Sequence, residues 1–164
     1  MSTSHSSHDE STNAGLSSAP QKSRLSPPPP KAIAEALGLT DLTVDWLAGD
    51  GSDRCYYRIC NPNTKKSYVL MQLSGSDLNH LQAGTYEWIE MSGILSEFDI
   101  LVPKPVVTMR DHGALIIEDY GDVMLETKAL ECVKQGDLSK VLPLYFDCIE
   151  TLSKFISIRP SGSP

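Results

Sequence analysis

Residues 47–59, LAGDGSDRCYYRI, are the most informative part of this sequence for the fold. An apolar run at residues 43–47 leads into Gly49 and Gly51, and a second run rich in β-forming residues follows at residues 55–60. Two such runs joined by a glycine-bearing turn predict a β-hairpin. Glycines there let backbone N–H groups approach a phosphate without a Cβ in the way. The stretch lacks the third glycine of the G-x-G-x-x-G motif, so by itself it equally fits a plain hairpin turn.

Apolar periods and turn residues on both sides of this stretch predict the rest of the fold. We expect a short helix at 31–39, strands at 43–47, 55–60, 67–73, 106–109 and 114–118, and a helix at 77–97. Asp77 is the expected cap of the long helix, and Gly84 and Gly93 are its weak points. This order predicts an α+β fold, in which one helix packs against a five-stranded antiparallel sheet.

A second motif, LIIEDYGD at residues 115–122, accompanies GDGSDRCYYR at residues 49–58. Together they resemble the aminoglycoside phosphotransferase and choline kinase-like family. The best fit is its branch of bacterial cell-wall amino-sugar kinases, which phosphorylate N-acetylmuramate and N-acetylglucosamine at the anomeric hydroxyl. That branch carries a first loop close to GDAS-x-R-x-Y-x-R and a hinge close to LLLEDLGD. ILVPKP at residues 100–105 is similar to the family's entry to the fourth strand, and the resemblance covers roughly residues 40–158.

The resemblance implies a kinase-like small lobe that binds ATP with Mg²⁺. The nucleotide-binding residues that it implies are Gly49, Asp50, Gly51, Ser52, Asp53, Met71, Glu118, Asp119 and Tyr120. Backbone amides of residues 50–53 would cradle phosphates and Ser52 would add a hydroxyl, although Asp50 and Asp53 would repel phosphate unless they face solvent. The backbone of residues 118–120 would form the hinge for adenine; an edge strand reaching a turn is the plain alternative.

Met71 stands where kinase-like folds commonly place a lysine that holds the phosphates. The amino-sugar branch also tends to have methionine there, so the residue fits the branch and predicts weaker nucleotide binding. Glu87 or Glu90 would be the glutamate that pairs with such a lysine. Without the lysine, we interpret both as part of a solvated helix face.

The family's catalytic pattern, His-Gly-Asp with an asparagine five residues later, does not occur in this chain. None of the four histidines precedes Gly-Asp. Residues 135–137 read Gln-Gly-Asp, but the fifth residue after Asp137 is Leu142, and we interpret Asp137 as a helix cap. We therefore expect no catalytic residue and no metal ligand in this chain, and no activity from it alone. The metal ligands and the pocket for a sugar or aminoglycoside-like acceptor would belong to a second lobe.

Composition narrows the class of protein further. Residues 1–31 are rich in Ser, Thr and Pro and predict a disordered tail, before a lobe at 32–122 and the start of a second lobe at 123–164. The net charge is −7, and the tail carries +1, which leaves −8 on the rest and argues against nucleic acid as a partner. No run is long enough for a membrane span. The four cysteines form no C-x-x-C pair, so we expect reduced thiols in the cytoplasm.

After residue 122 the apolar period becomes helical, at 123–133 and again over 141–156. Pro143 either kinks the second helix or marks its start. Its apolar stripe would pack on further structure, so we expect an exposed apolar face and self-association. Three functions stay open: part of an amino-sugar kinase, an inactive nucleotide-binding or regulatory module that pairs with another chain, and a decayed fragment.

Overall fold

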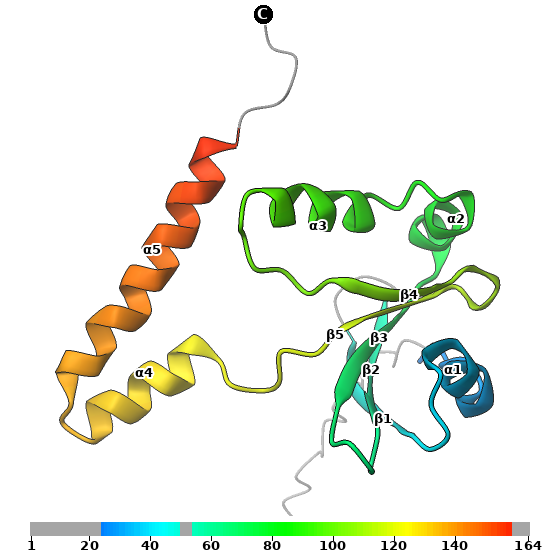
Figure 1. Cartoon of the computed structure of the whole chain (residues 1–164), viewed down its shortest axis with the longest axis horizontal. Coiled ribbons are helices and arrows are strands. Elements are labelled where there is room, and N and C mark those ends of the chain that lie inside the picture. Colours follow the sequence, from blue (N-terminus) through cyan, green and yellow to red (C-terminus); the bar gives the residue numbers. More distant parts are fainter. Residues whose placement is uncertain (1–23, 50–53, 159–164) are drawn as a thin grey trace, which may run out of the picture.

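Figure 1 presents the computed structural model of the chain, which describes residues 24–49 and 54–158. The strands are β1 (Thr43–Gly49), β2 (Cys55–Cys60), β3 (Ser67–Gln72), β4 (Pro105–Met109) and β5 (Ala114–Glu118). The α-helices are α1 (Pro30–Leu37), α2 (Gly75–Ala83), α3 (Glu87–Glu97), α4 (Leu125–Lys134) and α5 (Val141–Ser157), and the 3-10 turns are η1 (Arg110–His112) and η2 (Leu138–Lys140).

The five strands form one antiparallel sheet in the order β1-β2-β3-β5-β4. The expected α+β class and the five-stranded antiparallel sheet are therefore confirmed. Strand bounds differ by one or two residues, as β1 runs on to Gly49 and β4 begins at Pro105. Both differences follow from pairing, because Gly49 lies opposite Cys55 and Pro105 opposite Ile117.

The expectation of one helix against the sheet is wrong, because helices cover both faces. Alternate side chains of a strand point to opposite faces. The residues packed with α1 are Ile33, Tyr57, Ile59, Leu70 and Ile116. Those packed with α2 and α3 are Met71, Leu73, Leu81, Tyr86, Leu115 and Ile117. We call the second face the α2/α3 face.

The expected helix at 77–97 is two helices. Gly84 has a φ of +79°, and its N–H bonds to the carbonyl groups of His80 and Leu81, which ends α2 in the left-handed conformation that glycine favours. Asp77 lies in the first turn of α2 and does not cap it, since the N-cap position is Ser74. The weak point foreseen at Gly84 is thus a real helix end, while Gly93 lies within α3.

Structure begins earlier than the expected boundary at residue 32. Pro28 is buried, the Tyr57 hydroxyl donates to the Leu25 carbonyl, and the Arg24 guanidinium lies 3.8 Å from the centre of the Trp46 ring. Helix α1 itself starts at Pro30, a position where a missing N–H costs nothing. Residues 24–31 therefore belong to the folded part, while the rest of the expected tail lies outside the described residues.

Helices α4 and α5 form a hairpin that stands apart from the sheet in Figure 1. Pro143 lies in the first turn of α5, two residues after its start, so it marks the beginning of the helix. Asp137 precedes the short turn η2, where its carboxylate accepts from the Ser139 hydroxyl at 2.6 Å and pairs with Lys140 at 2.7 Å. It caps no long helix. In the described part of the chain, no helix has the length and apolar character needed to cross a membrane.

Candidate functional site

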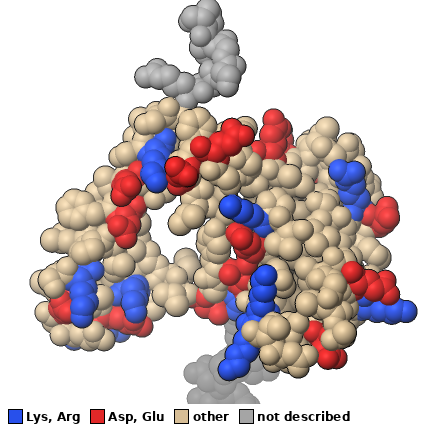
Figure 2. All heavy atoms as spheres, viewed as in Figure 1, with Lys and Arg blue, Asp and Glu red and all other residues tan. Residues whose placement is uncertain are grey.

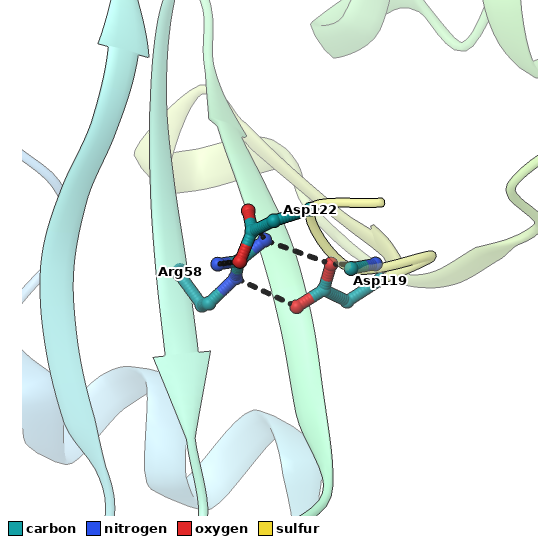
Figure 3. Close-up of polar contacts among 4 residues, drawn as sticks. Arg58, Asp119 and Asp122 are labelled. Carbon is teal, nitrogen blue, oxygen red and sulfur yellow. Dashed lines mark hydrogen bonds and ion pairs between the residues drawn. The ribbon is translucent and has the colours of Figure 1, made fainter. Parts of the chain in front are cut away.

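An arginine holds the segment that follows β5 (Figure 3). Arg58 Nε lies 2.8 Å from Asp119 Oδ2, and Nη1 and Nη2 lie 2.7 and 2.8 Å from the two carboxylate oxygens of Asp122. The Asp119 side chain is 3% exposed and that of Asp122 is 75% exposed. Arginine meets carboxylates best in this two-pronged arrangement. We call the segment between β5 and α4, residues 119–124, the linker, and Arg58, Asp119 and Asp122 the linker clamp.

The register of the sheet explains why Arg58 reaches so far. Arg58 lies opposite Val69 of β3, and Val69 lies opposite Ile117 of β5. Arg58 alternates with Tyr57 and Ile59 of the α1 face, so its side chain stands on the α2/α3 face. Neighbouring strands are about 4.8 Å apart, and the long arginine side chain crosses β3 to reach residues just after β5.

The charges of the linker clamp stabilise one another. Burial is the largest influence on Asp119 and opposes its charged form, but hydrogen bonds from the Gly121 N–H, from Ser67 and from Arg58 outweigh it. The pKa of Asp119 therefore lies below its ordinary value. Hydrogen bonding to Arg58 likewise lowers the pKa of Asp122, and the pKa of Arg58 is raised by Asp122 and Asp119.

The three expected hinge residues meet at the end of β5, but each does something different. Glu118 donates its N–H to the Lys104 carbonyl at 3.0 Å and accepts the Lys104 N–H on its carboxylate at 3.1 Å. Asp119 accepts the Gly121 N–H at 2.8 Å, which closes a tight turn. Tyr120 is 59% exposed. The side chains of Glu118 and Asp119 thus hold the backbone of this segment in shape.

Met71 lies on the α2/α3 face, where the expected phosphate contact would be, and its side chain is only 2% exposed. The Tyr86 hydroxyl approaches its sulfur at 3.5 Å. In this structure Met71 is a core residue between the sheet and α2/α3. Glu87 and Glu90 are exposed at the start of α3, as the interpretation of a solvated helix face predicted.

At the other end of the sheet, Gly49 is the last residue of β1 and lies opposite Cys55. The expected phosphate-binding residues Asp50, Gly51, Ser52 and Asp53 lie outside the described residues. Arg54, the residue just before β2, forms an ion pair with α2, because its Nη1 lies 3.8 Å from Asp77 Oδ2.

The sequence reasoning assigned no role to Arg58 or Asp122, although both lie inside the quoted motifs. The available signal was the position of an arginine on a half-buried strand, where a charge needs a partner.

Among the described residues, no group of three or more His, Cys, Asp or Glu side chains could hold a metal ion.

Comparison of the chain with protein-family models, with curated proteins and with solved structures finds no match.

Proposed function

We propose that this chain is the amino-terminal, nucleotide-binding part of an ATP-dependent small-molecule phosphotransferase, with an amino sugar as the acceptor class. The observation that carries the proposal is the placement of the two motifs. Gly49, at the end of β1, and Glu118, at the end of β5, lie at opposite ends of one sheet, and β2 and β3 pair in register between these two strands.

The distance between the two motifs suits an extended nucleotide. Glu118 lies opposite Tyr68 at one end of β3, and Cys55, the partner of Gly49, lies opposite Gln72 at the other. Four residue steps along a strand span about 13 Å, and the three strand spacings from β1 to β5 add about 14 Å sideways, so Gly49 and Glu118 lie about 19 Å apart across the sheet. That is close to the full length of an extended nucleoside triphosphate. A base at residues 118–120 would place its phosphates near Gly49.

The α2/α3 face between these ends offers an apolar surface for a base and a ribose. Tyr56 and Val69 are half-buried on this face and pack against its core. Backbone groups of Glu118 to Tyr120 would orient the base, and backbone N–H groups beside Gly49 would meet the phosphates. Arg58 is already paired with two carboxylates, so its part is to hold the linker in place.

We expect the metal that accompanies ATP to be held by the second lobe rather than by the described residues. Mg²⁺ in such sites takes carboxylate and phosphate oxygens, and the side chains near the two motifs offer it no cluster of ligands among the described residues. The metal would neutralise phosphate charge when bound. Met71 adds no charge to phosphates, so we expect weak binding, in the high micromolar to millimolar range.

Calorimetric titration of the full chain with Mg-ATP tests this proposal. The informative variant is Val69→Phe, which adds bulk to the proposed base surface, and the matched control is Val106→Phe, since Val106 is 41% exposed on β4. We expect Val69→Phe to abolish ATP binding and Val106→Phe to retain it, with both variants folded by circular dichroism. A folded wild-type chain that binds no Mg-ATP at millimolar concentration would refute the proposal.

The second candidate is an inactive nucleotide-binding or regulatory module that pairs with another chain. The large apolar surface of α4 and α5 favours it, since no residue of α5 is buried. A turnover assay with ATP and amino sugars separates the two candidates when a second polypeptide carrying His-Gly-Asp is supplied. Activity only in the mixture supports the kinase, and ATP binding without activity in the mixture supports the module.

A further inference from the structure

Helix α5 carries an exposed apolar stripe that nothing in the proposed nucleotide site uses. Its members are Leu142 (63% exposed), Tyr145 (48%), Ile149 (56%), Leu152 (60%) and Ile156 (83%). We call these five residues the α5 seam. Side chains this apolar and this exposed rarely gather on a protein that stays monomeric.

The spacing of the seam is that of a helix-packing surface. Its residues follow one another at intervals of three, four, three and four along α5. This alternation is the heptad pattern with which one helix packs along another. The seam is about 21 Å long at 1.5 Å per residue, which is enough for four turns of contact.

The partner of the seam is not α4. The half-buried apolar residues of α5 are Val141, Leu144 and Cys148, which lie to one side of the seam. Helix α4 buries only Ala129 and Cys132. In Figure 1 the hairpin stands away from the sheet, and the side-chain bond that joins α5 to the lobe runs from Lys154 to the Asp99 carbonyl at 3.2 Å. Among the residues that the structure describes, no element covers the seam.

The area of the apolar surface approaches that of a stable interface. Leu138 (63% exposed) extends the seam at its start. At roughly 100 Å² for each half-exposed large apolar side chain, these six residues present on the order of 600 Å². A stable dimer needs about 800 Å² from each partner, so the seam supplies most of it. Phe146 (63%) lies beside the seam and adds to it.

Charge does not oppose the approach of a second, equally acidic copy. The charged residues of α5 are Asp147, Glu150 and Lys154, which a turn of 100° per residue places on the side of the helix away from the seam. Figure 2 shows charged side chains of both signs near the two ends of the hairpin, and acidic side chains together with uncharged surface between them. A second copy could cover the seam without burying any ionised group.

We propose that the α5 seam joins two copies of this chain, with their α5 helices antiparallel about a two-fold axis. With Leu138 included, the intervals read four, three, four, three, four, which is the same in both directions. An antiparallel second copy therefore brings Tyr145 against the second copy's Ile149, and Leu142 against its Leu152. Such a self-complementary surface is what a two-fold dimer requires. The proposal is independent of nucleotide binding.

Light scattering coupled to size-exclusion chromatography of the full chain tests the proposal. The wild-type chain is expected to have the mass of two copies at tens of micromolar. Ile149→Glu buries an unpaired charge in the dimer and should give a monomer with unchanged far-ultraviolet circular dichroism. Thr151→Glu adds the same charge at an exposed position on the charged side of α5, and should remain a dimer.

A mixing experiment tests the antiparallel register. Tyr145→Lys and Ile149→Glu should each be monomeric, and an equimolar mixture should form a heterodimer, because the new lysine and glutamate then face each other. A wild-type monomer at all concentrations, larger assemblies that survive Ile149→Glu, or equal dissociation by Thr151→Glu would overturn the proposed interface. Failure of the two single variants to pair on mixing would overturn the antiparallel arrangement.

Discussion

Replacing Arg58 with methionine should destabilise the protein through the carboxylate that it leaves behind. Methionine is apolar and similar in length, so the main change is that Asp119, 3% exposed, loses its cation. Breaking a buried ion pair from one side costs about 3 to 5 kcal/mol. Because 21% of the Arg58 side chain is exposed, water screens part of this, and we expect about 2 to 3 kcal/mol. For a domain near 100 residues this lowers Tm by roughly 10 to 20 °C.

The measurement is urea unfolding of four proteins: wild type, Arg58→Met, Asp119→Asn and the double variant. If the cost comes from an unpaired buried charge, Asp119→Asn should recover stability in the Arg58→Met background and lose it in the wild-type background. Asp122→Asn is the control on the exposed side of the linker clamp, since Asp122 is 75% exposed, and it should change stability least. A further loss from Asp119→Asn in the Arg58→Met background would refute this reasoning.

Four other outcomes follow from the same structure. Met71→Lys should cost roughly 3 to 5 kcal/mol in unfolding experiments, because it buries an ammonium at a 2% exposed position; a gain in ATP affinity with unchanged Tm would contradict this. Acidification should remove the stability that Asp119 supplies, because its pKa is lower in the folded state: the loss begins near the unfolded pKa of about 3.9 and continues as the pH falls through the folded pKa. Thermal melts at about pH 5 and pH 3 should therefore differ less for Asp119→Asn than for wild type. Gly113→Ala should cost about 1 to 2 kcal/mol by thermal melt, because φ is +62° and the new Cβ would lie 2.5 Å from Leu78 Cδ1. Tyr57→Phe removes the hydrogen bond to the Leu25 carbonyl, so limited proteolysis should cut residues 24–29 faster, and a cleavage rate equal to wild type would show that other contacts hold this segment.

The strands were predictable because the local pattern and the tertiary context agree. Residues 55–60 and 114–118 are short β-rich runs bounded by turn residues, and both are strands with almost the expected bounds. The same residue pattern says less about which helices pack on each face of the sheet. Strands β3 and β5 carry apolar residues on both faces. Any sheet buried on both sides has this pattern, so the pattern does not tell which helices cover which face.

Some features of the candidate site could likewise be predicted from the sequence, and others could not. The motif at residues 115–122 predicted a chain segment that leaves the end of a strand, and β5 ends at Glu118. The motif could not reveal that Arg58, more than sixty residues away from Asp122, holds the segment, because that contact depends on β3 lying between β2 and β5. The role of Met71 was inferred from its place on the third strand of the resemblance, and only the packing around it shows that it is buried.

The local elements, the turn positions and the amphipathic character of α5 could be predicted from the sequence, because each depends on residues within a few positions of one another. Long-range packing, by contrast, is visible only in the folded structure: α1 covers the face opposite α2 and α3, Tyr57 and Trp46 hold Leu25 and Arg24, and Arg58 pairs with Asp119 and Asp122. These contacts join residues far apart in the chain, and their formation depends on which strands become neighbours. The physical reason is that a pattern along the chain records which face of an element is apolar, whereas the partner of that face is chosen by the packing of the whole fold.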